Sequence, residues 1–95
     1  MIPYAKHFID NEDIEAVAKV LRGSKITQGS TVEAFEEMVA TKSGAKYAVA
    51  VSSGTAALHL GLLSLDLFSN ERVVTSPLTF VATPAAIIHA GLVPK

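Results

Sequence analysis

The sequence predicts an α/β fold in the order α-α-β-α-β-α-(β), with an incomplete sheet, from two strand-to-helix repeats and an unfinished third strand. Residues 46–51 are a short apolar run that turns through small polar residues into an Ala/Leu-rich helix pattern. Residues 72–75 are a β-branched run, followed by a polar loop and a helix with Thr83 as N-cap and Pro84 at its first position. Strands that alternate with helices indicate parallel pairing. Residues 92–95 begin a third strand, which suggests that the chain is truncated at this point.

An extended arm and an amphipathic helix are expected at the N-terminus. Residues 1–9 have no helical period, and Pro3 restricts the backbone of the arm. Asp10 is followed three residues later by Asp13, the spacing of a reciprocal N-terminal cap. Apolar residues then recur on one helical face until Gly23, where the helix should end.

A second helix is expected after a polar loop. Ser30 and Glu33 have the spacing of a capping box, and Ser43-Gly44 has the composition of a helix end. The loop of residues 24–30 is either a functional loop or a plain connector, and its composition leaves both interpretations open.

The turn after the first predicted strand has the composition of a phosphate cradle. Ser53-Gly54-Thr55-Ala56 leads directly into a helix pattern. The first amides of a helix lack intrahelical partners and lie at the positive end of the helix dipole, so they can hold a phosphate. An ordinary helix cap would explain the same residues, because the further glycines of a dinucleotide fingerprint and the Gly-Lys-Ser/Thr of a nucleotide loop are absent.

Two loops are predicted to share this site. Residues 52–55 follow the first strand, and residues 76–80 follow the second. Ligands of open α/β sheets bind at the carboxyl ends of the strands. Phe80 would therefore present its ring beside the amides of the first loop.

Composition argues against several other classes of function. The net charge of −1 gives no electrostatic reason to expect nucleic acid, and the absence of cysteine excludes disulfides and thiolate metal sites. His7, His59 and His89 lack metal-ligand spacing, so no metal is expected. No apolar run approaches the roughly 20 residues of a membrane helix, and no signal peptide is recognisable, so we expect a cytoplasmic protein.

Three segments together carry a family resemblance. They are Ile26-Thr27-Gln28-Gly29, residues 48–58 (AVAVSSGTAAL) and residues 75–83 (TSPLTFVAT). In this order and spacing they resemble the N-terminal part of the DegT/DnrJ/EryC1/StrS sugar aminotransferases. Within that family, the opening Pro3-Tyr4, the Thr27-Gln28-Gly29 loop and the TSPLTF segment of residues 75–80 look most like the transaminases that make UDP-4-amino-4,6-dideoxy-N-acetyl-β-L-altrosamine for pseudaminic acid.

The resemblance implies the N-terminal portion of a fold-type I transferase that depends on pyridoxal 5′-phosphate and works as a homodimer. It assigns the cofactor to Ser53, Gly54, Thr55, Ala56 and Phe80, with the phosphate on the turn and the Phe80 ring on the pyridine. It assigns the border of the nucleotide-sugar substrate to Tyr4, Ser24, Lys25, Ile26, Thr27 and Gly54.

The implied reaction moves an amino group from glutamate to a 4-keto-6-deoxy UDP-N-acetylhexosamine. The family's Schiff-base lysine would lie beyond Lys95, so the 95-residue chain alone is expected to be inactive. The implied organisation is an arm, helix and substrate loop over residues 1–30, and the first part of the large cofactor-binding domain over residues 31–95. The alternative is a non-catalytic phosphate- or nucleotide-binding α/β module, in which Phe80 would only be a core residue.

Overall fold

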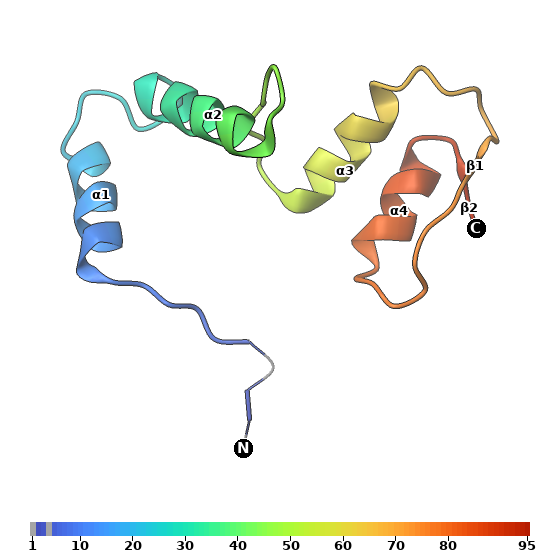
Figure 1. Cartoon of the computed structure of the whole chain (residues 1–95), viewed down its shortest axis with the longest axis horizontal. Helices are drawn as coiled ribbons and strands as arrows, with labels where there is room; N and C mark the ends of the chain where they lie inside the picture. Colours follow the sequence, from blue (N-terminus) through green and yellow to red (C-terminus); the bar gives the residue numbers. More distant parts are fainter. Residues whose placement is uncertain (1, 4) are drawn as a thin grey trace. The chain divides into compact units, whose positions relative to one another are not determined.

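The computed structural model describes residues 2–3 and 5–95, which form two compact units, Met1–Ala50 and Val51–Lys95. The first unit contains α1 (Asn11–Leu21) and α2 (Ser30–Ser43). The second contains α3 (Gly54–Leu63), β1 (Arg72–Val73), α4 (Ala82–His89) and β2 (Val93–Pro94) (Figure 1). Within the described residues, no helix is long and apolar enough to cross a membrane.

Helix α1 begins with the reciprocal cap that its sequence predicts. The Asp10 carboxylate accepts the N–H of Asp13, and the Asp13 carboxylate accepts the N–H of Asp10, both at 3.1 Å. Two amides that would otherwise lack partners are thereby satisfied. The helix ends at Leu21, with Arg22 as its C-cap, just before Gly23.

Helix α2 begins differently from the prediction and ends as predicted. Gly29 is the N-cap, at φ 96°, and no side chain caps the helix, so the predicted capping box of Ser30 and Glu33 is wrong. Gly29 adopts a backbone conformation that other residues disfavour, so the chain turns at this glycine. Ser30 is then the first helical residue instead of the N-cap. At the other end, Gly44 closes the helix in the left-handed conformation, at φ 69°.

The strand predicted over residues 46–51 is wrong for this structure. The segment has no strand assignment, and none of the described residues pairs with it in a ladder. A strand requires a neighbour for its backbone groups, whatever the propensity of its side chains. One of these groups has a side-chain partner instead, because the Ala50 N–H donates to Glu36 Oε1 at 2.7 Å.

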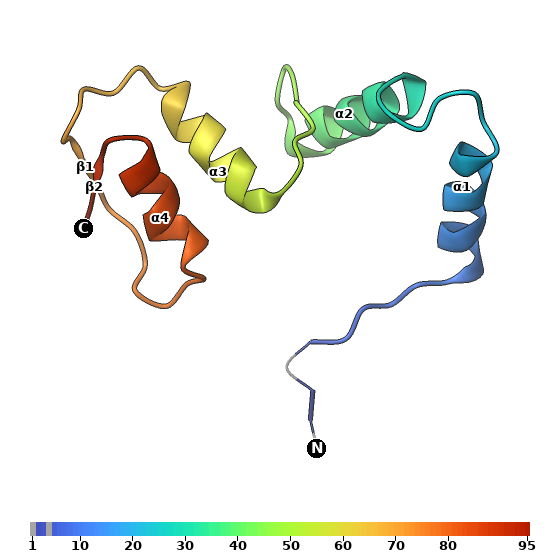
Figure 2. The same cartoon turned by 180° about the vertical axis from the view of Figure 1, so that it is seen from behind.

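The second unit is a β-α-β arrangement with α3 packed beside it. β1 and β2 pair in parallel, with Arg72 opposite Val93 and Val73 opposite Pro94, so the predicted parallel pairing is confirmed. α4 connects the two strands and packs against both β2 and α3, as both views show (Figure 1 and Figure 2). The buried apolar residues of the described chain all belong to α4 or to the turn that follows it: Ala82, Ala86, Ile87 and Leu92.

The start of α4 also differs from the prediction. Val81 is the N-cap and makes no side-chain cap hydrogen bond, so the assignment of Thr83 as N-cap is wrong. The Thr83 hydroxyl instead lies 2.9 Å from the Thr79 hydroxyl in the preceding loop. By contrast, α3 begins at Gly54, inside the segment of residues 53–56 that is predicted to lead into a helix.

Candidate functional site

The N-terminus of α3 has two amides that have no acceptor among the described residues. Ser53 is the N-cap, in an extended conformation, and its Oγ accepts the Ala56 N–H at 3.1 Å. Its carbonyl accepts the Ala57 N–H at 3.0 Å. Among the described residues, no acceptor bonds to the amides of Gly54 and Thr55. These two N–H groups, at the positive end of the helix dipole, are free to bind an anion.

The space beside this helix start is open. Apart from its chain neighbours and the backbone of its own helix, a Cβ placed on Gly54 would meet no heavy atom of the described residues within 4 Å, and the backbone of Gly54 is not in the left-handed region. Neither local crowding nor backbone conformation therefore requires glycine at this position. Gly54 leaves its own amide and the Thr55 amide accessible to a ligand.

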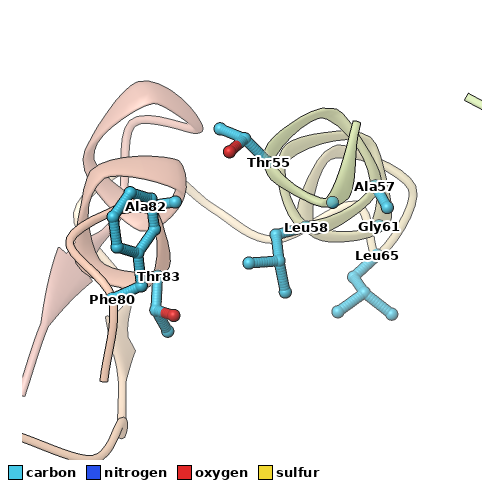
Figure 3. Close-up of a pocket in the computed structure, with 9 residues that line it drawn as sticks. Thr55, Ala57, Leu58, Gly61, Leu65, Phe80, Ala82 and Thr83 are labelled. Carbon is cyan, nitrogen blue, oxygen red and sulfur yellow. The ribbon is translucent and has the colours of Figure 1, made fainter. Parts of the chain in front are cut away.

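A pocket of about 870 Å³ lies against this end of α3. It is lined by Gly54, Thr55, Ala57, Leu58, Gly61, Leu65, Phe80, Ala82 and Thr83. Thr55 and Leu58 extend from α3 on one side, and Phe80, Ala82 and Thr83 border the other side (Figure 3). The volume lies within the roughly 300–1,000 Å³ range of small-molecule sites.

Three of the five predicted cofactor residues line the pocket. Gly54 and Thr55 contribute from α3, and Phe80 contributes an aromatic ring that is 76% exposed in this chain. Ser53 and Ala56 do not line it; the Ala56 N–H donates to Ser53 Oγ as the helix cap. The structure thus brings Phe80 and the amides of Gly54 and Thr55 to one cavity, whereas the Ala56 amide is already bonded to Ser53.

Sequence reasoning missed the apolar wall of this pocket. Leu58 and Gly61 lie on the face of α3 that continues from Gly54, and Leu65 follows in the turn just after the helix. These positions are three and four residues apart, which is the spacing of one helical face. This spacing is the sequence signal by which they could be predicted. The pocket therefore combines apolar side chains with two free amides, a composition typical of small-molecule sites.

The predicted substrate residues have different positions in the structure. Ser24 and Lys25 line a pocket of about 450 Å³ in the first unit, which Lys19 and Gln28 also border. Ile26 and Thr27 are exposed but do not line that pocket. Gly54 lines the pocket of the second unit, and Tyr4 lies outside the described residues.

Within the part of the chain that the structure describes, no three His, Cys, Asp or Glu side chains come together to hold a metal ion. The structure does bring together two histidines that are distant in sequence. The ring centroids of His59, on α3, and His89, on α4, lie 6.0 Å apart in an edge-on arrangement.

Comparison with known proteins places this geometry in context. The model of the DegT/DnrJ/EryC1/StrS aminotransferase family matches residues 7–95. The chain is 42% identical over 93 residues to the spore coat polysaccharide biosynthesis protein SpsC of Bacillus subtilis, covering 98% of this chain and 24% of that protein. It is 41% identical over 91 residues to a Campylobacter jejuni UDP-4-amino-4,6-dideoxy-N-acetyl-beta-L-altrosamine transaminase, covering 96% and 24% respectively. The chain thus spans about a quarter of the length of these relatives.

Solved structures resemble the chain over nearly its whole length. Helicobacter pylori PseC, an aminotransferase involved in the biosynthesis of pseudoaminic acid, superposes with a TM-score of 0.89 at 33% identity, covering 98% of this chain and 26% of PseC. The PLP form of Spr1654 from Streptococcus pneumoniae gives a TM-score of 0.88 at 29% identity, covering 99% of this chain and 24% of Spr1654. These matches confirm the predicted fold class, a portion of a PLP-dependent transferase fold.

Proposed function

The chain belongs to the DegT/DnrJ/EryC1/StrS aminotransferase family, and from this we propose that it forms part of a nucleotide-sugar aminotransferase dependent on pyridoxal phosphate. The proposed reaction moves an amino group from glutamate to a 4-keto-6-deoxy UDP-N-acetylhexosamine. Support for this substrate class comes from the Campylobacter jejuni transaminase and from PseC, whose names specify a related amino sugar and its pathway. We propose a homodimer in the cytoplasm as the working form.

One observation carries the proposal at the level of residues: two free helix amides and an aromatic ring line the same pocket. A cofactor phosphate carries close to two negative charges and needs several donors at once. The amides of Gly54 and Thr55 and the Thr55 hydroxyl could supply them, with Ser53 keeping the helix start in place. The residues present therefore fit the phosphate and the ring of pyridoxal phosphate.

The residues of this chain would bind and orient the cofactor. When bound, pyridoxal phosphate supplies the carbonyl group that carries nitrogen between donor and acceptor. Gly54 and Thr55 would hold its phosphate, and Phe80 would offer a face for its pyridine ring, which limits the tilt of the ring. We assign no catalytic residue within this chain.

For the substrate, we propose that the loop of Ser24, Lys25, Ile26 and Thr27 borders the nucleotide sugar, together with Tyr4 and Gly54. The polar pocket at Ser24 and Lys25 supports this role, because its lysines could attract the phosphates of a nucleotide sugar. We propose residues 1–30 as the arm, helix and substrate loop, and residues 31–95 as the first part of the cofactor-binding domain.

The test is a titration of pyridoxal phosphate into the full-length protein that carries this segment. Thr55→Val keeps the shape and the amide but removes one charge-assisted hydrogen bond, worth about 1.5–3 kcal/mol. Cofactor affinity should therefore fall by roughly 10- to 150-fold. Thr41→Val, at an exposed position on α2, is the matched control and should leave affinity unchanged.

The same protein separates the enzyme from a phosphate-binding module without catalysis. Glutamate-dependent amination of the 4-keto nucleotide sugar, followed by mass spectrometry, should give the amino sugar. Tight binding of pyridoxal phosphate without any amination of keto sugars would favour the module. Unchanged affinity in Thr55→Val would remove the α3 turn from the phosphate site.

A further inference from the structure

The loop that carries Phe80 is closed by short-range hydrogen bonds. Thr79 Oγ1 and Thr83 Oγ1 lie 2.9 Å apart, and the Thr83 N–H donates to the Phe80 carbonyl at 3.0 Å. Earlier in the loop, Ser76 Oγ accepts the Leu78 N–H at 3.2 Å. Thr79 and Thr83, on either side of Phe80 in the sequence, are thus joined by their hydroxyl groups.

Packing does little to hold Phe80. Its side chain is 76% exposed, and Leu78, two residues earlier, is 94% exposed. The direction of the ring consequently depends on the backbone of the loop rather than on neighbouring side chains. A loop with exposed side chains and few buried contacts would otherwise sample many conformations.

The two hydroxyls are suited to fix this backbone. Threonine is branched at Cβ, which limits χ1 and keeps the hydroxyl in few orientations. Thr83 belongs to α4, whose Ala82, Ala86 and Ile87 are buried, so the contact ties the loop to the most buried helix of the unit. It also explains why the Thr83 hydroxyl does not cap the helix.

We propose that the Thr79–Thr83 hydroxyl pair is a latch that positions the Phe80 ring in the pocket; its effect on the cofactor depends on the proposed function. Thr83 lines the pocket and could touch a ligand itself, whereas Thr79 does not line it. Thr79 is therefore a positioning residue, acting on the ligand only through Phe80. The latch lowers the number of loop conformations that a flat ligand must select on binding.

The first measurement needs no cofactor. In the full-length protein, Thr79→Val should speed hydrogen exchange at the Thr83 amide by about 2- to 12-fold, the range expected for one neutral hydrogen bond. Thr79→Ser keeps the hydroxyl and should restore exchange to within about twofold of wild type. Unchanged exchange in Thr79→Val would overturn the latch.

The second measurement asks whether the latch acts through Phe80. Thr79→Val should weaken pyridoxal phosphate binding by about 2- to 12-fold. In a Phe80→Ala background the same change should have no further effect, because no ring remains to be positioned. An equal loss in both backgrounds would indicate general loosening and would overturn the positioning role.

The hydrogen-exchange measurement tests the latch, and the binding measurement also tests the proposed function, so failure of one can be distinguished from failure of the other. A wild-type protein that binds no pyridoxal phosphate would contradict the cofactor assignment and the role of Thr79 toward it. Faster exchange in Thr79→Val, with rescue by Thr79→Ser, would still establish the hydroxyl latch itself.

Discussion

At the residue scale, α2 is bounded by two glycines in the left-handed region. Gly29 has φ 96° and Gly44 has φ 69°. A Cβ at Gly44 would meet no heavy atom of the described residues within 4 Å apart from its chain neighbours, so crowding is not a factor there. The requirement for glycine at the end of α2 therefore comes from the backbone angle alone.

Gly44→Ala should destabilise the end of α2 by about 1–2 kcal/mol, because alanine tolerates the left-handed region poorly. Gly44→Asn is the matched control and should cost less, since asparagine visits this region more readily. Urea unfolding followed by far-UV circular dichroism measures both. Equal stabilities of the alanine variant and the wild type would contradict the backbone argument.

Residue-scale predictions from sequence succeeded where the partner was local and had no competitor. Asp10 and Asp13 cap α1 reciprocally because each finds its acceptor or donor within one turn. The cap predicted at Ser30 failed because the preceding glycine takes the turning position. The cap predicted at Thr83 failed because its hydroxyl has a partner in the preceding loop. The sequence pattern shows which residues can cap a helix, but not which of several possible partners each residue binds in the fold.

At the element scale, one hydrogen bond ties α2 to the segment that follows it. Glu36 Oε1 accepts the Ala50 N–H at 2.7 Å, across fourteen positions of sequence and in a partly buried setting. Hydrogen bonds to charged acceptors contribute about 1.5–3 kcal/mol. Glu36 therefore fixes the end of a segment that forms no ladder with the described residues.

Removal of this acceptor should expose the Ala50 amide. Glu36→Ala is expected to raise hydrogen exchange at Ala50 by roughly tenfold or more, the change that 1.5 kcal/mol produces. Glu37→Ala removes the neighbouring exposed carboxylate of the same helix and should leave that amide unchanged. If both variants exchange alike at Ala50, the hydrogen bond does not protect this segment.

The same segment shows why one predicted strand is missing while another pair is present. Residues 46–51 and 72–75 both have the composition of strands, but only the second finds a partner, at residues 93–94. The local pattern describes side chains, whereas a ladder also needs a second backbone. The pocket could be predicted only in part. The order of strands and helices predicts that its two loops meet, whereas its apolar lining also depends on how α3 and α4 pack.

At the scale of the whole molecule, most large apolar side chains are exposed and burial is concentrated around α4. Ile87 is 3% exposed, whereas its neighbour Ile88 is 59% exposed. The two residues have the same side chain on the same helix, so they form a matched pair. They isolate the contribution of burial to the stability of the unit Val51–Lys95.

Ile87→Ala should destabilise this unit by about 2–5 kcal/mol, through lost burial and the cavity left behind. Ile88→Ala should change stability by no more than about 0.5 kcal/mol. Hydrogen exchange at the Leu92 amide, which donates to the Ile87 carbonyl at 3.0 Å, reports both variants. Equal effects of the two substitutions would mean that burial at Ile87 does not stabilise the unit.

The packing around α4 also bears on how fast this unit forms. Its buried residues all lie between positions 82 and 92, and the two paired strands are separated by little more than one helix. Contacts this close in sequence have small loop-closure costs, which favours folding in the microsecond-to-millisecond range. Bacterial and eukaryotic ribosomes add residues at only about 5–20 per second. The unit can therefore reach its packed arrangement in less time than a ribosome needs to add one residue.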